Sequence, residues 1–147
     1  MNGEVSAGWL HESFEDDRLT PVSALLLDGA LAWSPMRGTT LQLAGATTIE
    51  GSTSAADSGS VLYSTSLALR RDVRPDLTLG ALGGLSFRDY VTSSATETTL
   101  TAEVSATWWM NRFAGIDGRV RHERFDSTLP NRDYEESSVY LGLKLQR

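Results

Sequence analysis

Apolar and polar residues alternate with a period of two in eight segments of the chain, whereas a helical period is not convincing anywhere. The pattern is cleanest near the C-terminus, where Val139, Leu141, Leu143 and Leu145 alternate with more polar residues. In every segment one face is rich in Leu, Val and aromatic residues. The pattern predicts eight β-strands, at about residues 3–13, 22–33, 39–50, 61–71, 77–90, 98–109, 116–123 and 137–146.

The connections between these segments alternate strictly in length. Three are short and contain turn residues, at 34–38, 72–76 and 110–113, and four are longer and polar, at 15–21, 51–60, 91–97 and 126–136. Most segments are long enough to cross a bilayer as a tilted strand, and an even strand number with alternating short turns and long loops is typical of bacterial outer-membrane barrels. We therefore predict an all-β protein, an eight-stranded antiparallel up-and-down transmembrane β-barrel, in a single domain over residues 1–147.

Alternation alone does not tell which face meets water, since a soluble lipocalin-like barrel has the same period. The polar face consists mainly of Ser, Thr, Gly and Ala, which suit the crowded lumen of a small barrel better than an outer surface in water. Lys144 is the only lysine, which also suggests that little of the surface faces bulk water. Aromatic residues gather near both ends of the segments, as they do at the two membrane interfaces.

The charged residues of the polar face carry both signs. Because buried charges persist when they are paired, we predict that they form a salt-bridged network that plugs the lumen. The predicted members are Glu4, Glu12, Asp28, Glu50, Arg70, Arg88, Glu103, Asp117, Arg119, Arg121, Glu123 and Lys144.

Composition narrows the choice of partners. The net charge of -6 argues against nucleic acid, because phosphate binding needs a basic surface. The chain has no cysteine, so disulfides and thiolate chemistry are excluded. No segment is apolar enough for a transmembrane helix, and the start lacks the features of a signal peptide, which is compatible with a cytoplasmic chain or with a mature or excised segment. We expect membrane lipid or detergent as the partner, with lipopolysaccharide as a further candidate.

The segments resemble a family of outer-membrane β-barrel porins that are often associated with exopolysaccharide or capsule export. The similarity lies in the stretches 3–10 and 14–18, in Ala32-Trp33-Ser34-Pro35, in Asn111-Arg112 and in the terminal run 139–146. Members of that family are longer, so the chain is similar to their C-terminal part, and the terminal Phe usual in outer-membrane barrels is replaced by Gln146-Arg147. The resemblance implies a non-catalytic barrel of the bacterial outer membrane.

Two groups of residues are weaker candidates for chemistry. His11 and Ser13 have a spacing similar to the His-x-Ser pair of outer-membrane lipid A deacylases, with Glu15 or Glu123 as a candidate acid. The loop carboxylates Glu15, Asp16 and Asp17 are candidates for a divalent cation that bridges lipopolysaccharide phosphates. A two-residue motif such as His11 and Ser13 is more often simply polar residues at the headgroup boundary, and three consecutive acids in a loop are more often simply solvated. No cofactor or resident metal is expected, and the two alternatives to a porin-like barrel are a lipid-modifying barrel enzyme and a soluble ligand-binding barrel.

Overall fold

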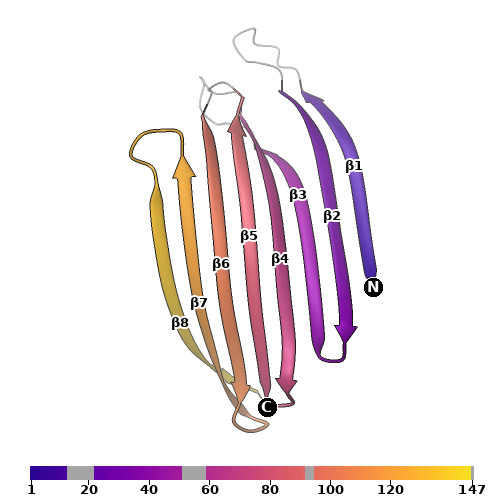
Figure 1. The fold of residues 1–147 in the computed structure, drawn as a ribbon, viewed down its shortest axis with the longest axis vertical. Coiled ribbons are helices and arrows are strands. Elements are labelled where there is room, and N and C mark those ends of the chain that lie inside the picture. The colour runs from indigo at the N-terminus through magenta and orange to yellow at the C-terminus, as the bar shows by residue number, and fades with distance from the viewer. Residues whose placement is uncertain (13–21, 51–58, 92–94, 147) are drawn as a thin grey trace.

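The computed structural model describes residues 1–12, 22–50, 59–91 and 95–146, and these residues form eight β-strands. Figure 1 shows the strands side by side in one sheet. No helix of the described residues could cross a membrane. The strands are β1 (Asn2–Glu12), β2 (Val22–Met36), β3 (Thr39–Glu50), β4 (Ser60–Arg74), β5 (Leu77–Tyr90), β6 (Thr96–Trp109), β7 (Ala114–Ser127) and β8 (Tyr134–Leu145).

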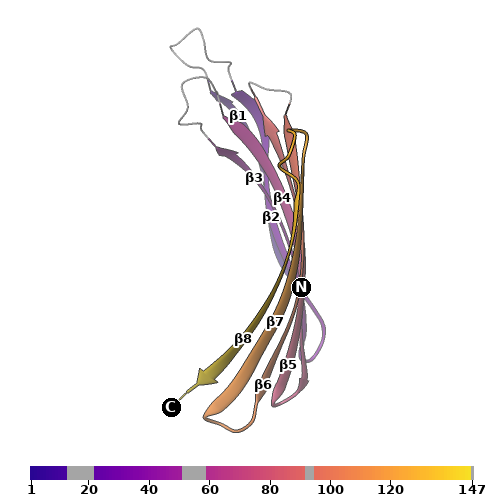
Figure 2. The ribbon, with the colours of Figure 1, turned by 90° about the vertical axis from the view of Figure 1, so that its left-hand side faces the viewer.

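Each strand pairs with the next one along the chain in antiparallel orientation, so the sheet has the order β1 to β8 without a crossover. This confirms the predicted eight strands and their up-and-down topology. The sheet is not closed: β1 and β8 are its two edges and are not hydrogen-bonded to each other. Seen from the side, the sheet is twisted and bent, with the upper ends of β1 and β3 and the lower end of β8 turned to the same side (Figure 2).

The strands extend further at the short turns than the sequence suggested. β2 continues through Pro35 to Met36, because a register shift between Trp33 and Met36 accommodates a residue that has no N–H to donate. The connection to β3 is then only Arg37-Gly38, with Gly38 at a φ of 73°. In this tight turn Gly38 has the positive φ, which glycine adopts without steric cost.

The strands also extend further at the opposite end, which holds the longer connections and is called the loop end here. Glu97, Tyr134 and Glu136 were predicted to lie in loops, and this was wrong: Glu97 lies in β6, and Tyr134 and Glu136 lie in β8. Hydropathy stops alternating where the apolar band ends, but hydrogen bonding between β6, β7 and β8 continues beyond it. The polar residues at the ends therefore prolong the strands.

In a water-soluble protein the apolar face of a sheet is buried and the polar face is exposed, whereas in this sheet the exposure of the two faces is reversed. In β4 and β6 the apolar residues are the exposed ones, with Leu67 51% and Val104 63% exposed, while the polar residues between them are half-buried. Only Ala24, Val61 and Ala95 are buried among the hydrophobic residues of the described chain. Exposed hydrophobic residues on nearly every strand form a continuous band far larger than the few-hundred-Å² patch of an ordinary soluble monomer.

This apolar band runs diagonally across the strands. One hydrogen-bonded row connects Val5, in the apolar part of β1, to Glu135, at the polar loop end of β8. In β1 the band centres on Ala7, and in β8 it spans Val139–Leu145. Relative to the hydrogen-bonded rows, the centre of the band shifts by about nine residues between β1 and β8. These two strands are seven strand spacings of about 4.8 Å apart. At about 3.3 Å per residue, keeping this band level requires the strands to tilt by about 40° from the direction perpendicular to the band, which is within the range of transmembrane barrels.

Candidate functional site

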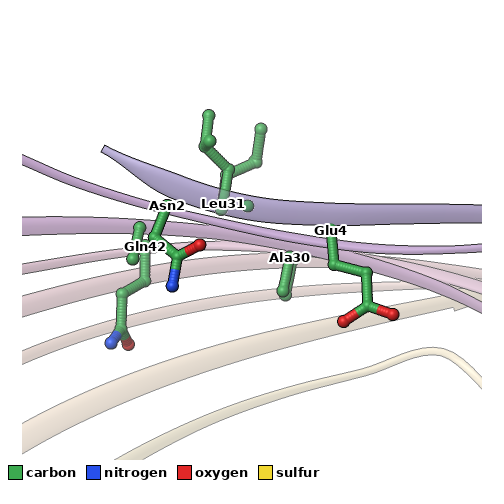
Figure 3. A pocket seen from close by; sticks show the side chains of 9 residues that line it. Asn2, Glu4, Ala30, Leu31 and Gln42 are labelled. Atoms are coloured by element: carbon green, nitrogen blue, oxygen red, sulfur yellow. The ribbon is translucent and has the colours of Figure 1, made fainter.

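The polar face of the sheet is the surface on which the predicted charges lie, and its two halves differ in character. The half formed by β1 to β4 has few charges, with Glu4 and Asp28 among residues that are mostly small or uncharged. A hollow in this half is lined by Asn2, Glu4, Ala30, Gln42 and Ala44, among others. Figure 3 shows Asn2, Glu4, Ala30 and Gln42 on one side of the sheet and Leu31 on the other. Strict alternation along the paired strands produces this separation.

The other half, formed by β6 to β8, has a series of ion pairs. Arg119 Nε lies 3.4 Å from Glu103 Oε1, and Arg121 Nη2 lies 2.6 Å from Glu123 Oε2. The Tyr134 hydroxyl donates a hydrogen bond of 2.8 Å to the same Glu123 carboxylate. Charged groups that the sequence places 16 or more residues apart, such as Glu103 and Arg119, meet here because β6 and β7 are neighbours.

A further pair lies near the turn end. The Lys144 Nζ donates to Asp117 Oδ1 at 2.8 Å, and the Thr107 hydroxyl donates to the same oxygen at 2.6 Å. Lys144 Nζ also reaches the Thr107 hydroxyl, at 3.2 Å, so one lysine connects β8, β7 and β6. The carboxylate of Asp117 is only 12% exposed, and the two donors compensate for its partial loss of water.

The most buried charge of the polar face lies at the loop end and was missed by the sequence analysis. The Glu97 side chain is 6% exposed and is contacted by Arg88 at 3.5 Å and by Arg132 at 3.4 Å. The Tyr90 hydroxyl donates to it at 3.0 Å, and Arg88 also pairs with Glu50 at 3.0 Å. Glu97 continues the odd-numbered polar positions of β6, and that alternation was the signal that could have identified it.

The remaining predicted charges are less connected. Arg70 pairs with Asp72, which was not among the predicted members, at 3.6 Å. Glu4 and Asp28 have no ion pair within the described part of the chain. Glu12 is the last residue of β1, and its side chain lies outside the described residues.

All these ion pairs are formed along the wall of the sheet. Partners that both lie on strands are on the same strand, on neighbouring strands or on strands separated by one other, as in the pair of Arg88 on β5 with Glu50 on β3. Arg132, which pairs with Glu97, lies in the connection between β7 and β8. The cationic side chains remain in contact with solvent, Arg119 being 50% and Arg121 47% exposed. The face therefore carries charges of both signs, and these two cationic side chains are half-exposed. The residues that the structure describes contain no cluster of three or more His, Asp or Glu suited to a metal ion.

Of the candidate catalytic residues His11 and Ser13, His11 does not belong to this charged polar face. The Nδ1 atom of His11 lies 2.7 Å from the Ser23 hydroxyl of β2, while Ser13 lies outside the described residues. His122 and Ser137 form a similar pair, at 2.9 Å, between β7 and β8. Neither imidazole has a carboxylate partner among the described residues, and Glu123 belongs to the polar face, bonded to Arg121 and Tyr134. Glu15, Asp16 and Asp17 also lie outside the described residues.

An antiparallel up-and-down sheet with an exposed apolar band on one face and paired charges on the other defines a membrane β-barrel wall. The sequence model of the family described as "Putative beta-barrel porin 2" matches residues 1–147. The chain belongs to this family, which confirms the resemblance to β-barrel porins. No curated protein and no solved structure matches the chain.

Proposed function

We propose that this chain forms the wall of a non-catalytic porin in the bacterial outer membrane and that its polar face is the surface past which polar solutes move. The inversion of the two faces is the observation that supports this most strongly. Apolar side chains such as Val104 are exposed, and carboxylates such as Glu103 and Glu97 are sheltered. Exposed apolar side chains gain from contact with lipid, whereas a charged lumen stays hydrated.

The solute and lipid partners follow from the chemistry of each face. The polar face has hydroxyl, carboxylate and guanidinium groups, which can form hydrogen bonds with the hydroxyl groups of sugars. This suits a role in exopolysaccharide export. At the loop end of the apolar face, Arg124 pairs with Asp126 at 3.0 Å and with Glu135 at 3.9 Å. These charges would lie at the level of the outer head groups, where lipopolysaccharide is the expected neighbour.

The experiment is to express the chain with an outer-membrane signal peptide and to fractionate the cells. We expect the folded chain in the outer-membrane fraction, with a gel mobility in SDS that changes when the sample is boiled. Purified chain should refold only in detergent or lipid. A folded monomer that is soluble in buffer, with a single mobility, would contradict the proposal and favour a lipocalin-like barrel.

The predicted plugging of the lumen depends on how many strands close the barrel. Eight strands enclose a space that side chains fill, whereas sixteen leave an aqueous channel. If the barrel closes with eight strands, we still predict that the charge network blocks the lumen. Planar-bilayer recording distinguishes the two widths, since the blocked lumen gives no steady conductance.

A further inference from the structure

In the ion pairs that connect β6, β7 and β8 on the polar face, the carboxylate lies against the sheet and the cation faces solvent. The side chain of Glu103 is 19% exposed, whereas that of its partner Arg119 is 50% exposed. The corresponding values for Glu123 and Arg121 are 20% and 47%. Lys144 is likewise more exposed than its carboxylate partner. The formal charges of these pairs cancel, but the groups that a solute meets are mainly cationic.

This difference does not come from the openness of the sheet, because the two partners of a pair have the same surroundings. On the opposite face of β7, Arg124 and its partner Asp126 are about equally exposed, and its second partner Glu135 is more exposed. On the polar face, the pair of Arg88 with Glu50, between β5 and β3, has the more exposed carboxylate. The sheltering of acids behind cations is therefore a property of the region formed by β6 to β8.

Hydroxyl groups of the sheet hold the carboxylates in this position. The Thr107 hydroxyl donates to Asp117 at 2.6 Å. The Tyr134 hydroxyl donates to Glu123 at 2.8 Å. The cations are less occupied, because a guanidinium has five N–H donors and Arg121 bonds only Glu123 among the described residues. The carboxylates thus position the cations, and the remaining N–H groups are available to an anionic solute.

Aromatic rings lie among these cations on the same face. Phe125 of β7 and Tyr134 of β8 are stacked, with ring centroids 5.0 Å apart. The Tyr140 ring covers Gly142, since its hydroxyl and two ring carbons lie within 2.9 Å of the place that a Cβ there would occupy. The Arg119 guanidinium carbon is 6.0 Å from the centroid of the Tyr140 ring. Transmembrane barrels place their aromatic girdles on the lipid side, so these lumen-side rings have a different role.

The order of these groups along the strands suits a chain of acidic sugars. From the turn end to the loop end, the paired rows contain Lys144, Arg119 beside Tyr140, Arg121, and the stack of Phe125 and Tyr134. They extend from the row of Gly115 to that of Phe125, about 33 Å at about 3.3 Å per residue. Sugar carboxylates pair with guanidinium groups, and the C–H faces of sugar rings pack on aromatic faces. A neutral sugar chain would leave the cations unused, and a small anion would leave the rings unused.

We propose that the polar face of β6 to β8 is the binding path of a carboxylate-bearing saccharide chain. Arg119, Arg121 and Lys144 pair with its carboxylates, and Tyr140 and the stack of Phe125 with Tyr134 support its rings. The proposal rests on the proposed function, because this face meets solutes only as the lining of a lumen. It requires that the lumen of the folded protein admits a sugar chain.

The test is isothermal titration calorimetry of the chain refolded in detergent, with an oligogalacturonate and a maltooligosaccharide of the same length as probes. We expect the acidic probe to bind at least about tenfold more tightly at low ionic strength, with a preference that falls as salt is added. Replacing both arginines (Arg119→Gln with Arg121→Gln) should abolish this preference. The matched control is Arg124→Gln, on the opposite face of the same strand, which should leave binding unchanged. Heat-modifiable mobility shows that each variant has folded.

Two further variants separate binding from a merely structural role of the ion pairs and rings. Glu103→Gln removes the sheltered partner and keeps Arg119, so binding of the oligogalacturonate should be retained or tightened. A structural role alone would give the same loss from either side of the pair. Tyr140→Leu should weaken the binding of the oligogalacturonate but not that of polyphosphate, an anionic polymer without rings.

Several results would overturn the proposal. They are equal affinity of the folded chain for the acidic and the neutral probe, binding of neither probe, or equal losses from the double arginine variant and Arg124→Gln. Polyphosphate binding as tight as that of the oligogalacturonate, without an effect of Tyr140→Leu, would show a site for any anion. These outcomes leave the porin assignment intact, whereas a chain that does not fold in detergent or lipid contradicts that assignment itself.

Discussion

Glu97 shows how a single residue of the polar face is stabilised. Its carboxylate is almost fully buried and accepts hydrogen bonds from Arg88, Arg132 and the Tyr90 hydroxyl. These contacts attach the connection between β7 and β8, which contains Arg132, to the start of β6. A hydrogen bond between Thr128 N and the Thr96 carbonyl, at 3.0 Å, reinforces the same attachment. A buried carboxylate with three donors contributes more to the stability of the fold than an exposed ion pair. The reason is that its removal leaves the donor groups without a hydrogen-bond acceptor or an opposite charge.

We predict that Glu97→Gln destabilises the folded chain by about 1–3 kcal/mol, since the neutral amide leaves Arg88 and Arg132 less compensated. The control is Glu135→Gln, whose side chain is 63% exposed and pairs with Arg124 only at 3.9 Å. An exposed pair of this kind contributes about 0–1 kcal/mol. Urea unfolding in lipid vesicles, followed by tryptophan fluorescence, measures both. Equal effects of the two substitutions would show that Glu97 contributes no more to the stability of the fold than an exposed ion pair does.

At the scale of the strand, neighbouring residues meet different solvents. In β4, Leu67 projects from the exposed apolar face and pairs with Leu43 and Gly83, while Ser66 lies on the polar face between Ala44 and Gly84. Leu67 also lies close to the centre of the apolar band that crosses the sheet. In a membrane barrel, one residue of difference in sequence would therefore change the environment from lipid to lumen.

The same substitution at these two positions tests the assignment of the faces. Leu67→Arg should lower the stability in lipid by about 2–4 kcal/mol, because its charge lies near the middle of the hydrocarbon. Ser66→Arg should be much milder, since small neighbours leave room and the charge faces water. The fraction of heat-modifiable protein after refolding, together with urea unfolding, gives the ranking. The reverse ranking would mean that the apolar face does not meet lipid.

For the whole molecule, the register of the eight strands determines how the sheet stands in the membrane. The apolar band remains level only if the strands are tilted, and the shift between β1 and β8 corresponds to about 40°. The same shift per strand applies to any closed ring of these strands, so the tilt does not depend on the number of strands in the ring. Charges at the loop end, such as Arg124 and Asp126, then lie above the band.

Polarised infrared spectroscopy of the chain in oriented bilayers measures this tilt through the dichroism of the amide bands. We predict a mean strand tilt of about 40° from the membrane normal. Water-soluble chain adsorbed on the membrane would give strands without this orientation. A tilt well below about 30° would show that the hydrogen-bond register or the apolar band has been assigned incorrectly.

The sequence by itself determined the number of strands, their order and which face of each is apolar. Period-two alternation is a local property of each strand, so residues such as Val139, Leu141 and Leu143 identified a face without any knowledge of neighbours. Alternating short and long connections then implied antiparallel neighbours. The family assignment rested on the same local features, and the match over residues 1–147 confirms it.

Only the tertiary structure decided which charges meet and where strands end. The pairing of Arg88 with Glu50 and Glu97 depends on the register of four strands, and alternation alone does not give that register. The continuation of β6 to Thr96 is fixed by hydrogen bonds to β7 beyond the apolar band. The open edges of β1 and β8 are likewise a property of the whole sheet, because closure depends on curvature and on strand number, which no single strand encodes.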